Sequence, residues 1–305
     1  MKFKPVFIEA TTINDAYHQL LWNLREFGRR YYITSGSYEG SYRLAFDDVS
    51  GFIHHPHVRP LAVSMPEGSN LPNPTTEEDI EKYFVNYLMD SNLQPNEHYK
   101  YATWIVGGRY HPPDLKCVRK DESLAMDLNY IWDKPIDILV PNQIQWIIDH
   151  FKNAGFGNEH CYLTVGYPQS NFAYNLPYTD ETERGTSPCL RGLDFRIIGE
   201  EYLECNNCNY ERDIDDFWEV DDFCPMCFDN FSRFKLARRN YLLTKVIYRS
   251  WNLYSGFPVN LAGIVLLNEY IANKLEIEPG PLSFTCKSLH AYDFEIPVIE
   301  QRLGK

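Results

Sequence analysis

The chain has 305 residues, of which 44% are hydrophobic and 15% aromatic, so it can bury one large core and is not intrinsically disordered. Its formal net charge of −13 argues against nucleic-acid binding, because such binding depends on lysines and arginines that neutralise phosphates. Its longest apolar stretch, residues 261–267, is too short to cross a membrane.

Helices and strands are both predicted in the first part of the chain. Apolar residues at helical spacing predict a helix over residues 14–28, with Thr12 or Asn14 as its cap. Residues 31–56 alternate between apolar and polar side chains, which is typical of strands. A second helix is predicted over residues 73–90, because threonines precede acidic residues at its start.

The same interleaving continues to the end of the sequence. Strands are predicted over residues 160–167, 189–205, 240–251 and 281–296. Helices are predicted over residues 143–157 and 260–277. The fold class predicted from this order is α+β with one large mixed sheet.

Four cysteines are spaced as metal ligands. Two CxxC pairs are separated by fifteen residues; they consist of Cys205, Cys208, Cys224 and Cys227. Four thiolates complete a tetrahedral shell around Zn²⁺ and leave no open position, so we expect a structural zinc site. The alternative, four ordinary core cysteines, is disfavoured by the spacing. The amino-terminal segment lacks a signal-peptide pattern, so we expect a cytoplasmic protein with reduced cysteines.

The zinc ligands lie between two runs that are predicted to be strands. These runs are residues 193–198 and 242–250, so the intervening residues 200–232 are predicted to form a zinc ribbon inserted in a β-hairpin. Ten acidic residues and one arginine lie between Glu200 and Asp222, which argues against a contact between this ribbon and phosphates.

Cys189 stands apart from these pairs, directly after a proline and before a predicted strand. Taken alone, such a cysteine is more often a core residue than a nucleophile. Three motifs around it nevertheless occur in a characteristic order: SPCL at 187–190, YRSWNLYSGFPVNLAG at 248–263 and LHAY at 289–292. Together they resemble the thymidylate synthase family, including the related nucleotide hydroxymethylases.

The resemblance implies a three-layer fold, with residues 1–305 forming the catalytic domain. It implies that the Cys189 thiolate attacks C6 of a uracil-type ring and that Arg249 lowers the pKa of this thiol. Arg249 and Ser250 would bind the nucleotide phosphate, and Asn260 would read the pyrimidine edge. The resemblance also implies that His290 and Tyr292 form hydrogen bonds with the sugar hydroxyl.

The resemblance also implies the partners of the reaction. These are a dUMP-like nucleotide and methylene-tetrahydrofolate, or a related reduced pterin, as the one-carbon carrier. The family implies a homodimer that packs its sheets back to back. The composition predicts neither a nucleic-acid partner nor a membrane partner.

Several family positions carry different residues here. Asn252 replaces an aspartate that usually touches the pterin, so it is the predicted cofactor-binding residue. Arg43 is the nominee for the phosphate-loop arginine. Residues 157–167 lack the arginine pair that reaches the partner subunit's phosphate, and His160 is a weak substitute. Leu190 replaces a histidine after the nucleophile.

Two further catalytic positions stay open. The tyrosine of the family's strand–turn segment corresponds to Val106, so Tyr101 or Tyr110 are the substitutes. The catalytic glutamate is expected on the helix over residues 73–90, with Glu78 and Glu81 as candidates.

Three functions are compatible with these residues. The first is thymidylate synthesis, dUMP to dTMP. The second is a dUMP or dCMP hydroxymethylase, because only thirteen residues follow Tyr292 and a closing tail would otherwise exclude water. Asn260 favours uracil, since cytosine-specific relatives tend to carry aspartate there. The third is a non-catalytic zinc-ribbon binding protein, against which the motif residues argue.

Overall fold

A mixed β-sheet forms the centre of the computed structural model, which describes residues 3–34, 38–64, 71–94, 97, 99–110, 138–167, 188–214, 223–228 and 234–304. Its seven strands are β1 (Val6–Ala10), β4 (Val49–Ile53), β7 (Tyr162–Thr164), β8 (Leu190–Cys205), β9 (Glu211–Asp213), β10 (Phe234–Tyr248) and β12 (Glu278–Cys286). They follow the order β1-β4-β12-β10-β8-β7, and β9 pairs with β8. The pairs β1–β4 and β10–β12 are parallel, whereas β4–β12, β8–β10 and β7–β8 are antiparallel.

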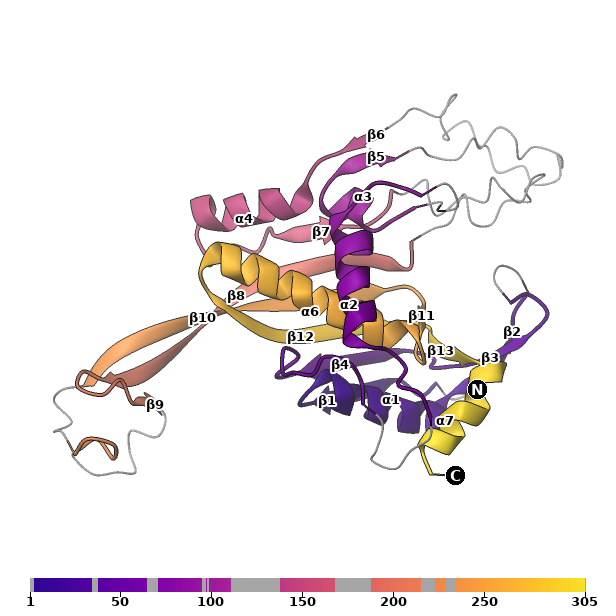
Figure 1. Ribbon diagram of the computed structural model, residues 1–305, viewed down its shortest axis with the longest axis horizontal. Coiled ribbons are helices and arrows are strands. Elements are labelled where there is room, and N and C mark those ends of the chain that lie inside the picture. Colours follow the sequence, from indigo (N-terminus) through magenta and orange to yellow (C-terminus); the bar gives the residue numbers. More distant parts are fainter. Residues whose placement is uncertain are drawn as a thin grey trace.

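Helices pack on this sheet and on one another. They are α1 (Ile13–Phe27), α2 (Glu77–Tyr83), its π-helical continuation η1 (Phe84–Met89), α3 (Ala102–Ile105), α4 (Gln143–Ala154), α6 (Gly256–Leu275), η7 (Asp293–Glu295) and α7 (Ile296–Arg302). Helix α6 lies along the sheet and α2 crosses it (Figure 1). Helix α6 is apolar on most of its surface because it packs against the sheet, α1, α2 and α4.

Among the residues that the structure describes, helices cover one face of the large sheet and leave the opposite face uncovered. In β1, Val6, Ile8 and Ala10 are buried on the side of α1, whereas Phe7 is 66% exposed on the other side. The uncovered face has a hollow of about 560 Å³, lined by residues that include Phe7 and Lys245.

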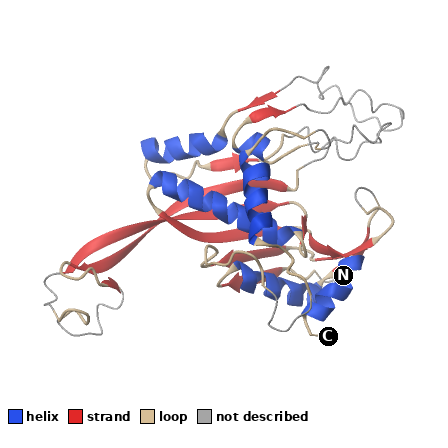
Figure 2. Ribbon diagram, in the orientation of Figure 1, coloured by secondary structure: helices blue, strands red, loops and turns tan. Residues whose placement is uncertain are grey.

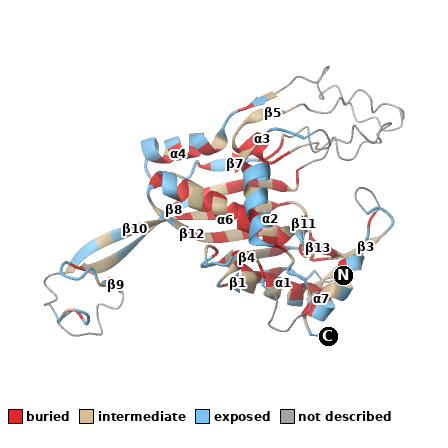
Figure 3. Cartoon of the chain, viewed as in Figure 1, coloured by how far each residue is buried: buried red, intermediate tan, exposed pale blue. Residues whose placement is uncertain are grey.

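The long hairpin of β8 and β10 leaves the body of the protein (Figure 2). The two strands pair antiparallel over their whole length, from Leu190 opposite Tyr248 to Cys205 opposite Phe234. One register shift lies near the base of the hairpin. The arm is largely exposed or half-buried, while the base beside α6 is buried (Figure 3). The predicted hairpin between the two strand-like runs is therefore confirmed.

Two smaller sheets complete the described structure. One has the order β11 (Trp251–Asn252), β13 (Leu289–Tyr292), β3 (Tyr42–Ala45) and β2 (Arg29–Tyr32). The other pairs β5 (Gly108–Tyr110) with β6 (Ile138–Val140). The α+β class and a large mixed sheet are confirmed, and the arrangement in three layers stays a prediction.

Local signals located most helix ends. Thr12 caps α1, Thr76 caps α2 through a capping box, and Gly155 ends α4 with φ 88°. No helix in the described part of the chain is both long and apolar enough to span a bilayer.

Three sequence predictions about elements were wrong. The last predicted strand is two strands, β12 and β13, which belong to different sheets and are followed by α7. Helix α6 begins at Gly256 after Ser255, so Asn260 lies inside the helix rather than at its N-cap. The segment of residues 101–110 contains the short helix α3 before its strand, because its apolar residues pack inward on successive turns.

Candidate active site

Cys189 lies at the base of the long hairpin, where the chain enters β8. The backbone N–H of Arg249 donates to the carbonyl of Cys189 over 2.9 Å. The Nε of Arg249 donates to the carbonyl of Pro188 over 3.1 Å. Residues distant in sequence are thus joined at the thiol, because the hairpin returns β10 alongside β8.

Burial and the neighbouring positive charges have opposite effects on the pKa of the Cys189 thiol. Burial raises the pKa of the Cys189 thiol, and the guanidinium groups of Arg249 and Arg191 oppose this rise. Arg249 thus lowers the pKa of the thiol as predicted, but burial has the larger effect, so the pKa is raised overall. Arg191 is a second cation at the thiol that the sequence motifs did not single out.

His290 presents an unpaired acceptor in a buried position. It is 3% exposed, and its Nδ1 lies 3.0 Å from the carbonyl of Ser288. A carbonyl only accepts, so Nδ1 carries the proton and Nε2 has a free lone pair. This Nε2 is buried and has no partner among the described residues. Burial lowers the pKa of His290 to about 4, so the ring is neutral at pH 7.

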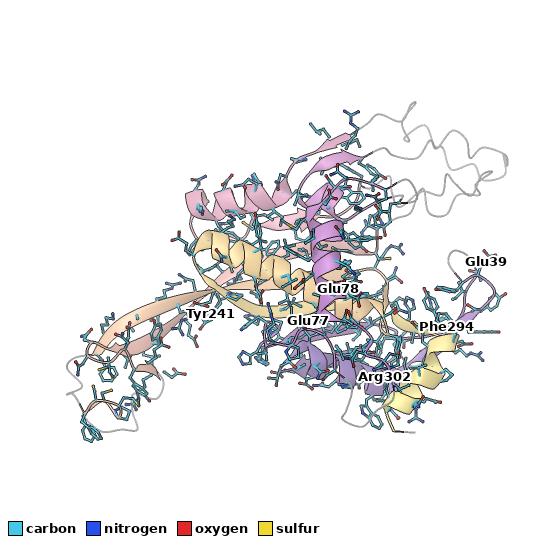
Figure 4. The ribbon with its side chains drawn as sticks, viewed as in Figure 1. Glu39, Glu77, Glu78, Tyr241, Phe294 and Arg302 are labelled. Carbon is cyan, nitrogen blue, oxygen red and sulfur yellow. The ribbon has the colours of Figure 1, made fainter. Side chains whose placement is uncertain are left out.

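Arg43 and Tyr292 face each other across the pair β3–β13. The buried Nε of Arg43 has no hydrogen-bond partner in the described structure. Tyr292 packs on Tyr38 at a ring distance of 4.4 Å and stacks on Phe294 at 5.6 Å. Figure 4 shows Phe294 beside α7 at this end of the molecule. Arg43, His290 and Tyr292 therefore lie close together, and their roles toward a nucleotide stay predictions.

Asn260 projects from the first turns of α6 and is tied to β11. Its Oδ1 accepts a hydrogen bond of 3.0 Å from the indole Nε1 of Trp251. Ser250 lies between Arg249 and Trp251, half-buried at the bend that joins β10 to β11. The middle motif thus forms one connected strand–bend–helix segment beside Cys189.

Asn252 has hydrogen bonds on both sides of its amide. Its Oδ1 accepts from the backbone N–H groups of Ser255 and Gly256 over 2.8 and 3.1 Å, which caps α6. Its Nδ2 donates to both carboxylate oxygens of Glu295, over 3.0 and 2.8 Å. The role of Asn252 toward a pterin stays a prediction.

Glu295 is a buried carboxylate that the sequence motifs did not reveal. It is 7% exposed, it accepts from the backbone N–H of Tyr292 over 2.7 Å, and burial raises its pKa. The signal that points to it is a glutamate three residues after Tyr292, the spacing of a capping box. The pair of Asn252 and Glu295 places an acceptor where an aspartate was expected.

A group of tyrosines surrounds Cys189 on the side of α2 and α3. The hydroxyl of Tyr101 accepts from the backbone N–H of Leu190 over 3.4 Å, and the ring of Tyr99 lies 5.7 Å from that of Tyr101. The hydroxyls of Tyr83 and Tyr248 are buried without a partner among the described residues, although each alters the pKa of the other. Of the predicted candidates, Tyr101 is thus beside the nucleophile's strand, and Tyr110 stacks on Tyr167.

The candidate glutamates lie elsewhere. Glu78 and Glu81 are exposed on α2, and Glu78 forms an ion pair of 2.6 Å with Lys82 (Figure 4). The side chains of α2 that face inward include Ile80, which is fully buried, and Tyr83, which packs on Gly263 of α6. Both candidates therefore lie on the exposed side of α2, and a catalytic glutamate on this helix stays a prediction.

The four ribbon cysteines lie together at the tip of the hairpin. Their ligand atoms are all within 4.8 Å of one another, with 3.7 Å between the sulfurs of Cys205 and Cys227 and 3.6 Å between those of Cys208 and Cys224. Zinc–sulfur bonds of about 2.3 Å in a tetrahedron separate the sulfurs by about 3.8 Å. The four thiolates thus fit a closed Zn²⁺ site.

The fold and site define a candidate enzyme with a nucleophilic thiol and unpaired polar groups around it. Residues 205–305 match the family model described as thymidylate synthase. A protein of Methanococcoides burtonii named "Putative thymidylate synthase" is 30% identical over 185 residues, which cover 58% of this chain and 76% of that protein. Proteins with the same name from Methanosarcina mazei and Methanosarcina acetivorans are 34% and 33% identical over 67 residues, which cover 22% of this chain and 30% of each relative.

The chain belongs to the thymidylate synthase family. At the level of the family, this assigns it to one-carbon transfer to C5 of a pyrimidine. The range matched by the family model includes Arg249, Asn260, His290 and Tyr292, whereas Cys189 precedes it.

Proposed function

We propose that this protein transfers a one-carbon unit to C5 of dUMP through a covalent adduct of Cys189, as a thymidylate synthase does. The observation that carries the proposal is that Cys189 lies beside Arg249 and within electrostatic reach of Tyr292, which shares strand β13 with His290. An unpaired acceptor and an unpaired guanidinium Nε near a thiol are what a sugar phosphate attached to an electrophilic ring requires.

The chemistry starts with the Cys189 thiolate. Its sulfur forms a bond to C6 of uracil, and the electrons of the C5–C6 double bond move toward C5 and O4. Arg249 and Arg191 stabilise the thiolate before the attack, which offsets part of the effect of burial. Phosphate binding by Arg249, Ser250 and Arg43 places C6 over the sulfur.

The other polar groups orient the nucleotide. The neutral imidazole of His290 accepts from a sugar hydroxyl through Nε2, and the hydroxyl of Tyr292 binds the same group. The reduced folate supplies the one-carbon unit when it is bound. Asn252 and the buried carboxylate of Glu295 would hold its pterin, because a carboxylate suits the N–H groups of that ring.

Tritium release from C5-tritiated dUMP in the presence of methylene-tetrahydrofolate tests this proposal. We expect release by the wild type and at least a 10³-fold loss in Cys189→Ser, because a hydroxyl is a far weaker nucleophile than a thiolate. Mass spectrometry of the product separates a methyl from a hydroxymethyl group. Absence of release from both dUMP and dCMP contradicts the enzymatic function and leaves a binding protein. Undiminished release by Cys189→Ser contradicts the role of this thiol.

We also propose a homodimer that uses the uncovered face of the large sheet. Phe7 is exposed on this face in the edge strand β1, and the hollow that it lines also carries Glu9 and Lys245. Light scattering should give twice the mass of the chain, and Phe7→Asp should give a folded monomer. A monomeric wild type contradicts the dimer and leaves the proposed chemistry standing.

We propose that the zinc ribbon is structural. A Cys₄ shell has no position for substrate, and the cluster lies at the far end of the arm from Cys189 (Figure 1).

A further inference from the structure

The hydrogen bond between Trp251 and Asn260 has a direction that chemistry fixes. The indole N–H of Trp251 donates, and it has no capacity to accept. The atom of Asn260 that faces it over 3.0 Å is therefore the amide oxygen Oδ1, and the amide nitrogen Nδ2 points elsewhere. Within the described chain, Nδ2 makes no hydrogen bond.

Trp251 is itself held rigidly. It is 3% exposed, and its ring stacks on that of Tyr248 at 3.9 Å and 9° and packs on Phe257 at 4.8 Å. Its backbone N–H donates to the carbonyl of Ser288 over 3.0 Å. A donor that cannot move fixes the amide that accepts from it.

A fixed amide can distinguish uracil from cytosine. Uracil presents an acceptor, O4, beside a donor, the N3–H, whereas cytosine presents the amino group at C4 beside the acceptor N3. With Oδ1 bound to Trp251, Nδ2 of Asn260 donates to O4, and the second lone pair of Oδ1 accepts from N3–H. Cytosine in the same position would set donor against donor and acceptor against acceptor.

Rotation of the amide to suit cytosine carries a defined cost. It would turn Nδ2 toward the indole N–H of Trp251, which would leave a buried donor without an acceptor. An unsatisfied buried donor weakens binding by about 10- to 100-fold.

We propose that Trp251 is a positioning residue that restricts this site to uracil nucleotides, because it holds the amide of Asn260 in one orientation. The inference rests on the proposed function, since it concerns the nucleotide that the site binds. It deepens that function by assigning the choice of base to a residue outside the pyrimidine contact.

The test compares two nucleotides in one variant. Trp251→Phe keeps a ring for stacking on Tyr248 and removes the indole donor together with part of the buried ring system. We measure kcat/KM for tritium release from C5-tritiated dUMP and dCMP, and the Kd of both nucleotides by calorimetry without folate. The ratio of dUMP to dCMP should fall about 10- to 100-fold in Trp251→Phe. Trp146→Phe is the control, because Trp146 is exposed on α4, and it should keep the wild-type ratio.

A loss of stability alone lowers both substrates together and does not alter their ratio. An unchanged ratio in a folded Trp251→Phe overturns the proposal, and the proposed function then still stands. If Trp251→Phe does not fold, site-specific replacement of Trp251 by benzothienylalanine decides, because this isostere keeps the shape of the ring and has no N–H donor. An unchanged ratio of dUMP to dCMP in that protein overturns the proposal. A wild type that neither binds nor converts either nucleotide refutes the proposed function and, with it, this inference.

Discussion

The buried imidazole of His290 makes the stability of this protein depend on pH in a way that one variant isolates. Its pKa is about 4 in the folded protein, against an ordinary value of 6.5. The unfolded chain therefore binds more protons than the folded one between these two values. The stability associated with neutral His290 is complete above pH 6.5 and is lost as the pH falls toward 4.

The size of the effect follows from the two pKa values. Between pH 7.5 and pH 4.5, protonation of His290 in the unfolded chain lowers the free energy of unfolding by about 2.5 kcal/mol. Glutamine at this position does not titrate and has a similar length. The difference in free energy of unfolding between the wild type and His290→Gln should therefore change by about 2.5 kcal/mol over this range.

Urea unfolding at five pH values between 4.5 and 7.5 measures this difference, and other titrating groups cancel in it. Leu139→Gln is the control, because Leu139 is 81% exposed and neither side chain titrates, so its difference from the wild type should stay nearly constant. A constant difference for His290→Gln as well would refute the claim that its imidazole is buried and neutral. Direct titration of His290 by NMR provides a second reading of the same quantity.

Three further predictions concern stability and the helix beside the site. Removal of zinc by a chelator should lower the melting temperature before it lowers activity at 25 °C, because binding energy at such sites is folding energy; a stable zinc-free protein contradicts the structural role. Gly263→Ala should cost about 1–3 kcal/mol of stability, since a Cβ there would lie 2.5 Å from the ring of Tyr83, whereas Gly157→Ala has open space and should unfold like the wild type. Glu78→Gln and Glu81→Gln should retain wild-type tritium release within about twofold, because both side chains are exposed; a tenfold loss would return a glutamate to the mechanism.

Much of the site was predictable from spacing in the sequence. The CxxC pairs predicted a cluster that four close sulfurs now form, because ligand spacing in a knuckle is a local property. The alternation of strand residues on either side predicted the hairpin that carries it. Caps at Thr12, Thr76 and Gly155 were likewise visible, since a cap depends only on a few neighbouring residues.

Predictions that needed distant partners were less successful. Acidity and position on a helix suggested Glu78 or Glu81 as catalytic, but the orientation of α2 against α6 turns Tyr83 inward instead. Arg249 lowers the pKa of Cys189 as predicted, but the larger opposing effect comes from burial of the thiol, which no local pattern encodes. The motifs also missed Glu295 and Arg191, because packing of distant segments brings Glu295 to Asn252 and sets the effect of Arg191 on Cys189.

The sequence by itself indicated the family, the cluster of four cysteines and most of the longer helices and strands, because motif spacing and hydrophobic period are local properties of the chain. Only the tertiary structure decided which polar atoms remain unpaired and which amides are held in place. The stack of Trp251 on Tyr248 and its hydrogen bond to Asn260 illustrate the point, since the first joins two strands and the second joins a strand to a helix. Burial and orientation are properties of packed elements, and they set the chemistry of residues that the sequence could only nominate.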